Sequence, residues 1–389
     1  MAGKLAPLAL VGLALAVPYF IGYFSYANGL LPLVHEIWHK GTLPDGTPLR
    51  THWTGLHKLD EVVSKLVIFF WPVTSYGHPA LTLHSIAFGG TFAAGWTLVT
   101  LEAWRDGSAW TLSSFTVFLG LVAQTLTWAF ATPVYGFLHL LTSASASVPS
   151  RANMHIPYAV LQALPLVFLV GNAVPSLAMI LPLSLSWNTP AVKQLLIAAW
   201  QPWPVYTAFG LTAAHLLLGG VLTAGDSPSP AGRKKSAAAL RFIYAIAFAN
   251  AAVSHLVALT VTVGAALAPA IFDPDYAVSL HPTKVLETIL PWAANPVAQI
   301  QTLGDGATIL LRWDYVLGTT SLLLWASVLH ARAYKHYEGK CVDVVSFLAK
   351  IATLYVVVGP AGAAVELMWE REEFALQTED KALTTKKKN

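Results

Sequence analysis

Two carboxyl groups lie inside long apolar stretches, where an ionisable side chain is energetically costly. Asp314 occurs in LLRWDYVLGTTSLLLW and Glu366 in GPAGAAVELMWERE. Because charge inside a membrane is expensive, each is a candidate functional residue. A carboxyl group kept away from water holds its proton more tightly, and such a group can act as a general acid. These residue types in this setting therefore predict proton donation inside an apolar site.

Each acid also has a structural interpretation. Asp314 stands at the start of an apolar run, where the dipole of a first helical turn would stabilise its charge. Glu366 and Glu370 are four residues apart and share a helix face, so this helix could simply end in a solvated charge cluster. We expect that solvated role for Glu370, Glu372 and Glu373. For Glu366, function and solvation stay open.

A third acid and two histidines complete the set of ionisable candidates. Asp60, in TGLHKLDEVV, precedes a short apolar segment, and we predict that it N-caps a helix, with catalysis as the alternative. His139, in PVYGFLHLLTS, and His255, in ANAAVSHLVAL, lie within apolar stretches. A lone histidine in a membrane segment is typical of a hydrogen-bonded bridge between helices.

One short motif indicates a different chemistry. His35, Glu36 and His39 form an HExxH match in HEIWH, the zinc-protease pattern. We expect this segment to be a loop, and no third ligand is evident, so a metalloprotease remains an alternative on this motif alone. Cys341 is the single cysteine, which excludes a disulfide framework and a thiolate metal cluster. Walker, dinucleotide-binding, nucleophile-elbow and aspartate-rich diphosphate motifs are absent, and we predict neither a metal nor a cofactor.

Aromatic residues are abundant, with 14 Trp, 13 Tyr and 17 Phe. Many are expected at the membrane interfaces. A cavity lined by aromatic rings also stabilises a cation through the ring faces. Together with a buried carboxylic acid, such walls would equip a site to form and guide a carbocation.

The composition indicates where these residues must be positioned. Of 389 residues, 55% are hydrophobic and 11% are charged, whereas soluble domains carry about 25% charged residues. A bilayer core about 30 Å thick needs roughly 20 apolar residues per helix. The net charge of +3 is too small to indicate a nucleic-acid partner. We therefore predict a polytopic membrane protein with no nucleic-acid partner.

Spans in lipid should be helices, because every backbone polar group must be satisfied internally. The predicted fold class is an all-α transmembrane bundle of one domain, 1–389, with a charged tail at 370–389. Segment 59–71 is too short to span, and we expect an amphipathic or re-entrant piece. The eight expected spans are 5–24, 79–104, 112–141, 156–183, 202–224, 240–268, 313–333 and 343–368. The prolines expected to break spans are Pro133, Pro165, Pro175, Pro182 and Pro360.

The two ends of the chain also bear on localisation. The first apolar run, 5–23, is long and lacks a typical small-residue cleavage site, so we expect a retained helix rather than a signal peptide. The chain ends in KKKN, which looks like a cytosolic dilysine retrieval signal. The predicted location is therefore an integral membrane position in the endoplasmic reticulum.

Several strings taken together resemble the fungal integral-membrane terpene cyclases of the ascochlorin and ascofuranone kind, found in meroterpenoid biosynthesis. The resemblance runs from about residue 54 to 373. The strings are TGLHKLDEVVSKLVIFFWPV, PVYGFLHLLTS, AAWQPWPVY, LLRWDYVLGTTSLLLWA and GPAGAAVELMWEREE.

The resemblance implies a class II type cyclisation. Such an enzyme protonates an epoxide or terminal alkene on a farnesyl or similar chain attached to a head group. Ring closure follows, and a deprotonation or rearrangement ends the reaction. No metal is needed because no diphosphate leaves. The implied partners are a hydrophobic prenylated substrate and the lipid bilayer.

The resembling strings contain most of the candidate site residues. The candidate proton donors are Asp314, Glu366 and Asp60. The residues expected to shape the substrate pocket are His139, Trp200, Gln201, Trp313, Tyr315, His255 and Arg371. A transporter or binding protein for a hydrophobic small molecule is the main alternative. The lack of inverted repeats and the scarcity of paired intramembrane charges argue against it.

Overall fold

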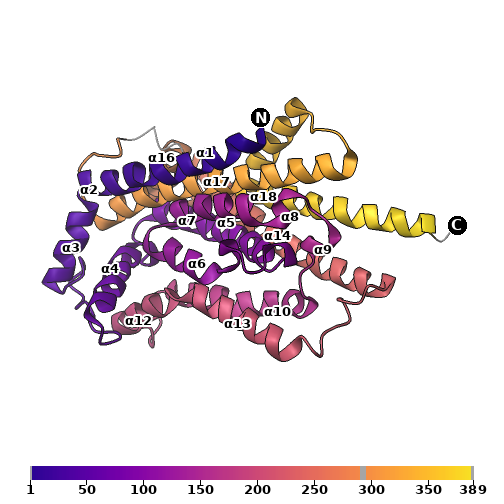
Figure 1. Cartoon of the computed structure of the whole chain (residues 1–389). Helices are drawn as coiled ribbons and strands as arrows, with labels where there is room; N and C mark the ends of the chain where they lie inside the picture. The colour runs from indigo at the N-terminus through magenta and orange to yellow at the C-terminus, as the bar shows by residue number, and fades with distance from the viewer. Residues whose placement is uncertain (1, 290–294, 387–389) are drawn as a thin grey trace.

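Long helices that run side by side make up the protein (Figure 1). The computed structural model describes residues 2–289 and 295–386. Within those ranges the backbone forms helices and helical turns, with one isolated β-bridge between Thr42 and Pro48. The all-α class predicted from the sequence is therefore confirmed. Residues 387–389 of the KKKN ending lie outside the described part of the chain.

The helices keep their chain order in the labels of Figure 1. They are α1 (Ala2–Val17), α2 (Phe24–Ala27), α3 (Leu30–Lys40), α4 (His57–Thr74), α5 (Pro79–Ala103), α6 (Thr116–Thr125), α7 (Trp128–Thr142), α8 (Ala144–Ser147), α9 (Arg151–Met154), α10 (Tyr158–Phe168), α11 (Val174–Met179), α12 (Pro190–Trp200), α13 (Trp203–Leu218), α14 (Pro230–Leu267), α15 (Pro274–Leu280), α16 (Pro282–Ile289), α17 (Leu303–Glu338) and α18 (Val344–Lys386). Two π-helical turns, Pro18–Tyr23 and Leu169–Ala173, join α1 to α2 and α10 to α11.

The centre of the bundle is built from a few long helices. Helix α5 packs against α14, α17 and α18, and α7 packs against α17 and α1. Helices α10, α12 and α13 lie along the opposite side from α1, and α3 and α4 close one end (Figure 1). Segment 59–71, predicted to be a short amphipathic piece, lies within α4, which packs against α3, α12 and α17.

Four helical segments of the described chain are long and apolar enough to cross a membrane. They are Leu5–Ala27, Arg151–Met179, Pro230–Leu267 and Val344–Gln377. The other four expected spans also contain helix, in α5, α6 and α7, α13 and α17, and the count of eight stays a prediction. Large apolar side chains point outward, including Leu216, Leu217 and Val221, which are 74%, 76% and 77% exposed. Such a surface is consistent with a lipid environment.

The prolines affect the helices unequally. Pro133 and Pro165 lie inside α7 and α10, which continue through them. Pro360 follows Gly359, whose φ of 76° and ψ of 169° make a kink in α18. A Cβ on Gly359 would lie 3.0 Å from the ring of His255. The kink therefore depends on glycine for both its backbone conformation and its close approach to α14.

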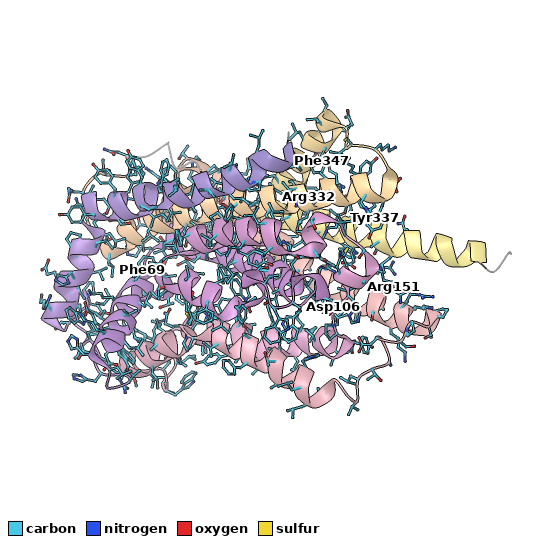
Figure 2. All side chains as sticks on the ribbon, in the orientation of Figure 1. Phe69, Asp106, Arg151, Arg332, Tyr337 and Phe347 are labelled. Carbon is cyan, nitrogen blue, oxygen red and sulfur yellow. The ribbon has the colours of Figure 1, made fainter. Side chains whose placement is uncertain are left out.

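Two hydrogen bonds fix helix α17 in the half of the bundle from which α18 projects. Arg332 and Tyr337 lie in that half, whereas Phe69 lies toward the other end (Figure 2). The Arg332 guanidinium donates to the Ala146 carbonyl at 2.9 Å, and the Tyr337 hydroxyl donates to the Pro149 carbonyl at 3.0 Å. These bonds hold α17 against the segment that follows α7.

The crossing of α5 and α14 predicts the effect of a small substitution. A Cβ on Gly90 would lie 2.1 Å from Oγ of Ser254 and 2.9 Å from the carbonyl oxygen of Asn250. We expect Gly90→Ala to lower the free energy of unfolding by about 1–3 kcal/mol, because a packed crossing does not accept an added methyl group. Thermal unfolding of the purified protein in detergent measures this.

The neighbouring glycine provides the control. A Cβ on Gly89 would meet nothing within 4 Å. Gly89→Ala should therefore be neutral or stabilise the helix by up to about 1 kcal/mol, because alanine loses less backbone entropy. Equal unfolding temperatures for the two variants would rule out the close crossing.

Candidate active site

Asp314 is buried on α17 and binds the start of another helix. Its side chain is 6% exposed, and Oδ1 accepts a hydrogen bond of 2.6 Å from the backbone N–H of Ala129 in the first turn of α7. The predicted position in the first turn of its own helix is wrong. Helix α17 begins at Leu303, where Thr302 and Asp305 form the capping box. Asp314 thus lies well inside α17 and satisfies a donor of α7 instead.

The residues on either side of Asp314 point toward different aromatic neighbours, because successive helical positions face different directions. The ring of Trp313 stacks on Phe20, with centroids 4.3 Å apart. The ring of Tyr315 lies 5.5 Å from His84 and 5.8 Å from Phe88. Trp313 therefore faces the segment that follows α1, and Tyr315 faces α5.

Helix α5 carries an aromatic stripe next to this position. Phe88, Phe92 and Trp96 recur at intervals of four residues and share one helix face. Phe88 and Phe92 each lie 5.6 Å from the ring of Trp128, and Trp96 lies 5.1 Å from Trp203. Trp128 is the first residue of α7, the helix whose N-terminus contacts Asp314. The buried carboxyl group and an aromatic wall thus meet at the start of α7.

Glu366 has a more open position on α18. It is partly exposed, and Glu370, one turn later, accepts a hydrogen bond of 2.9 Å from His330 and pairs with Lys350. Glu370 is therefore held in a paired cluster between α17 and α18. The predicted solvated role is wrong for Glu372, which is 5% exposed. Helix α18 continues past Trp369, so residues 370–386 form part of a helix.

Asp60 stabilises the loop before α4. Its Oδ1 accepts bonds of 2.7 Å from both the backbone N–H and the hydroxyl of Thr54, and Oδ2 accepts from Gly55 N–H at 3.3 Å. The predicted N-cap role is wrong, because the N-cap position is Leu56. Burial acts to raise the pKa of Asp60, but these hydrogen bonds outweigh it, and the pKa lies below its ordinary value. The carboxylate is therefore ionised at neutral pH and has no proton to donate.

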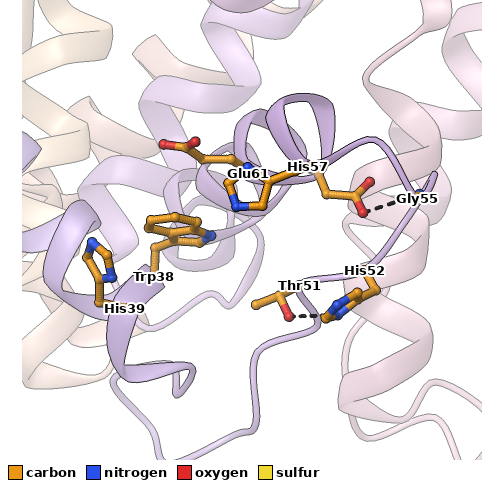
Figure 3. Close-up of a pocket in the computed structure, with 8 residues that line it drawn as sticks. Trp38, His39, Thr51, His52, Gly55, His57 and Glu61 are labelled. Atoms are coloured by element: carbon orange, nitrogen blue, oxygen red, sulfur yellow. Dashed lines mark hydrogen bonds between the residues drawn. The ribbon is translucent and has the colours of Figure 1, made fainter.

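Asp60 also lines a cavity of about 400 Å³ at the α3–α4 end of the bundle (Figure 3). The HEIWH segment borders it and lies in α3, so the predicted loop is wrong. Nε2 of His35 and Nε2 of His39 are 3.0 Å apart on adjacent turns. Across residues 2–289 and 295–386, no group of three or more His, Cys, Asp or Glu side chains is placed to hold a metal ion.

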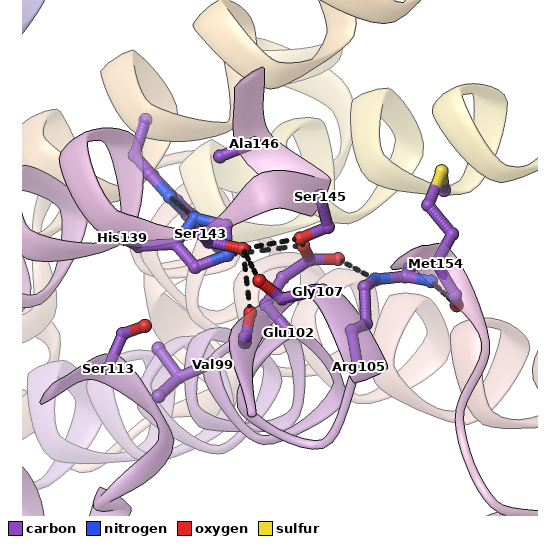
Figure 4. A network of polar contacts seen from close by, with 12 residues as sticks. Val99, Glu102, Arg105, Gly107, Ser113, His139, Ser143, Ser145, Ala146 and Met154 are labelled. Carbon is purple, nitrogen blue, oxygen red and sulfur yellow. Dashed lines mark hydrogen bonds and ion pairs between the residues drawn. The ribbon is translucent and has the colours of Figure 1, made fainter. Parts of the chain in front are cut away.

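His139 and Arg371 are brought together by a residue that the sequence analysis did not select. Glu102 is fully buried and accepts a hydrogen bond from Arg105 at 2.5 Å (Figure 4). It accepts a second one from Arg371 at 2.6 Å. Nε2 of His139 lies 3.4 Å from Oε2 of Glu102, the oxygen that does not bind the two guanidinium groups. Nδ1 of His139 accepts from the Trp325 indole at 3.2 Å, so the ring proton is assigned to Nε2, facing Glu102.

A second acid balances this cluster. Glu372 accepts a hydrogen bond of 2.6 Å from Arg105. Two guanidinium groups thus pair with two carboxylates, and the cluster joins α5, α7 and α18. The two positive and two negative charges balance, although Nε2 of His139 and Nε of Arg371 have no hydrogen-bond partner among the described residues. The rule that selected Asp314, an ionisable residue inside an expected span, also applies to Glu102 within 79–104 and could have identified it.

Three other predicted pocket residues make contacts between helices. The Trp200 indole donates to the Ser176 hydroxyl at 2.8 Å, joining α12 to α11. The backbone carbonyl of Gln201 accepts a bond of 3.2 Å from a glutamine side chain of α6. Nε2 of His255, on α14, lies 3.0 Å from the carbonyl oxygen of Val356, on α18. This contact is the bridge between helices that the sequence predicted for His255.

Known proteins resemble the chain over nearly its whole length. A family model described as the CtvD domain matches residues 6–376. Terpene cyclase ctvD of Aspergillus terreus is 29% identical over 355 residues, which cover 90% of this chain and 94% of that protein. Terpene cyclase penA of Penicillium crustosum is 29% identical over 366 residues, covering 92% of this chain and 94% of penA.

A third relative spans the complete chain. Terpene cyclase ascI of Acremonium egyptiacum is 28% identical over 400 aligned positions, covering 100% of this chain and 96% of ascI. No solved structure matches the chain. The identification made from the resembling strings is confirmed, and the chain belongs to the CtvD-domain family of terpene cyclases.

Proposed function

We propose that this terpene cyclase works within a membrane and starts cyclisation by transferring a proton from Asp314 to its substrate. The substrate is a prenyl chain that ends in an epoxide or an alkene and carries a polar head group. The observation that supports this most is the position of the Asp314 carboxyl group, 6% exposed and adjacent to an aromatic wall. Burial favours the protonated form that a donor needs.

With an epoxide, the proton moves from the Asp314 carboxyl group to the epoxide oxygen as the C–O bond breaks. Positive charge develops on the more substituted carbon. An alkene or an oxygen of the same molecule then forms the new bond, and one proton is lost from the resulting cation. The product is an isomer of the substrate, and a proton returns to Asp314 to complete the cycle.

The start of α7 assists the transfer. Ala129 donates its backbone N–H to Oδ1 of Asp314, and a helix N-terminus carries partial positive charge. Both interactions stabilise the carboxylate more than the neutral acid, so they strengthen as the proton leaves. Stabilisation that grows along the reaction lowers the barrier.

The aromatic wall suits the cation that follows. Phe88, Trp128 and Tyr315 lie on three helices around the start of α7, with Phe88 in contact with both others. The face of an aromatic ring attracts a cation by about 0.5–2 kcal/mol, more when water is excluded. The faces of these rings would stabilise the developing positive charge.

The other candidate acids fit this role less well. Asp60 is ionised and bonded to its own loop, and Glu366 is partly exposed on α18 next to the Glu370–Lys350 pair. We therefore assign proton donation to Asp314. The proposed membrane arrangement has eight spans, four of which contain helices long and apolar enough to cross a membrane, and the proposed location is the endoplasmic reticulum.

Heterologous expression with a prenylated epoxide tests the reaction. We expect mass spectrometry to find a cyclised isomer of unchanged mass, and EDTA to leave its rate unchanged because no diphosphate leaves. A product that has gained water, or one without a ring, would contradict cyclisation. Loss of turnover with EDTA, rescued by Zn²⁺ and reproduced by His39→Ala, would instead support a metal site at the HEIWH segment.

A further inference from the structure

Thr127 has an unusual backbone conformation at the corner where α6 meets α7. Helix α6 ends at Thr125 and α7 begins at Trp128, so two residues make the whole turn. The φ and ψ angles of Thr127 are 108° and 155°. Glycine occupies this region freely, whereas a β-branched residue enters it only at a cost. The surrounding structure therefore holds a threonine in a strained position, next to the point where Asp314 contacts α7.

The two residues that follow the corner fasten it to α17. Trp128 is 2% exposed, and a Cβ on Gly318 would lie 2.3 Å from its ring. Ala129 donates its backbone N–H to Oδ1 of Asp314 at 2.6 Å. Gly318 and Asp314 are four residues apart and share one face of α17. The first turn of α7 is thus fixed against that face, and Thr127, directly before it, absorbs the change in chain direction.

The side chain of Thr127 does not cap the helix that it precedes. Thr127 is the N-cap residue of α7, where a threonine hydroxyl ordinarily accepts an N–H of the first turn. No such bond forms here, and Asp314 accepts the N–H of Ala129 instead. The Thr127 hydroxyl and the backbone N–H of Trp128 also interact with the Asp314 carboxyl group. The hydroxyl is therefore placed beside the proposed proton donor.

This hydroxyl is not fully used in the resting protein. Oγ of Thr127 is buried and makes no hydrogen bond of ordinary geometry within the described part of the chain. A buried polar atom in that state is costly, and glycine would avoid both this cost and the backbone strain. Strain that persists in a structure is typical of functional sites. Hydrogen bonds of a resting active site are often long and tighten only during the reaction.

We propose that Thr127 is a positioning residue for the cyclisation, and that its hydroxyl donates a hydrogen bond to the Asp314 carboxylate as the proton leaves for the substrate. The inference rests on the proposed function and adds a side-chain donor to the N–H of Ala129. The proton moves from Asp314 to the substrate, and Thr127 keeps its own proton throughout. Because the new bond stabilises the carboxylate more than the neutral acid, it accelerates the chemical step and does not strengthen substrate binding.

Turnover by the full chain in phosphatidylcholine nanodiscs tests this, with a phenol that carries an epoxide-terminated farnesyl chain as substrate. Thr127→Val keeps the branched shape and removes the hydroxyl. We expect kcat to fall about 10- to 100-fold, the range for a hydrogen bond to a charged group, while KM stays within about threefold. Thr127→Ser keeps the hydroxyl, and its kcat should stay within about threefold of the wild type. Full kcat in Thr127→Val, or an equal loss in Thr127→Ser, would overturn the proposal.

Thermal unfolding separates this role from a packing role and needs no substrate. Thr127→Val should unfold at the wild-type temperature or above it, because the hydroxyl makes no completed bond in the resting protein. Thr127→Gly should unfold at a higher temperature than Thr127→Ala, because glycine adopts a positive φ without strain. An unfolding temperature of Thr127→Val well below that of the wild type would assign the hydroxyl to packing and overturn the proposal. The opposite order of the glycine and alanine variants would remove the strain on which the inference rests.

Thr125→Val is the matched control, the same substitution two residues earlier. Thr125 is exposed, and its hydroxyl donates to the Leu121 carbonyl of its own helix at 2.8 Å. This variant should keep the wild-type kcat, and a loss as large as that of Thr127→Val would count against the proposal.

Asp314→Asn separates the inference from the proposed function. If Asp314→Asn is inactive and Thr127→Val is fully active, the role of Thr127 fails and the proton donor stands. If Asp314→Asn is fully active, the proposed donor fails, and the role of Thr127 fails with it.

Discussion

Asp314→Asn is expected to reduce turnover by at least about 100-fold, the lower range for loss of a general acid. Asparagine keeps a carbonyl oxygen that can accept the hydrogen bond of 2.6 Å from Ala129 N–H. It cannot donate an acidic proton. Since asparagine and aspartate serve almost equally at helix N-termini, a purely structural role would tolerate this substitution. Product formation, measured at equal protein level, therefore separates the two roles of Asp314.

Three controls sharpen that result. The unfolding temperature of Asp314→Asn should stay close to that of the wild type, because the contact with α7 persists. Asp314→Ala should lose both turnover and stability, since it leaves the N–H of Ala129 unsatisfied. Glu366→Gln should keep most of its turnover, because Glu366 is partly exposed. If Asp314→Asn is fully active and Glu366→Gln is inactive, the proton donor is Glu366 on α18 and not Asp314.

The sequence selected Asp314 as a candidate site residue, but it did not predict the contacts of that side chain. Composition and apolar runs predicted helices, and the rule for ionisable residues in such runs selected Asp314. Its partner, Ala129, lies 185 residues earlier. Only packing of α17 against α7 brings them together, and no local pattern encodes that packing. The aromatic neighbours on α5 are likewise spread along a helix that was expected only as a span.

Local patterns misled where tertiary contacts decide the structure. The HEIWH segment was expected to be a loop, but its apolar residue Ile37 and the preceding Val34 are buried, and α3 forms there. The acidic residues after Trp369 were expected in solvent, yet Glu372 is 5% exposed and accepts a hydrogen bond of 2.6 Å from Arg105. A buried charge needs polar partners that the fold supplies, and a single segment of sequence does not reveal them.

The Glu102 cluster yields the second large effect. Glu102→Gln removes one charge and leaves Arg105 and Arg371 with only Glu372 as an acid partner among the charges of this cluster. Removing one partner of a buried ion pair costs about 3–5 kcal/mol, because an uncompensated charge remains away from water. We expect a loss of stability of that size, measured by thermal unfolding of the purified chain in detergent.

An exposed pair provides the matched control for that effect. Arg241 donates to both oxygens of Glu373 at 2.6 and 2.8 Å, but its side chain is 49% exposed, and exposed pairs contribute about 0–1 kcal/mol. Arg241→Gln should therefore change the unfolding temperature little. The double variant of Glu102→Gln with Arg371→Met leaves Arg105 facing Glu372 in a neutral pair, so it should be less destabilised than the sum of the two single variants. Additive losses, or equal unfolding temperatures for Glu102→Gln and Arg241→Gln, would show that charge balance does not hold these helices together.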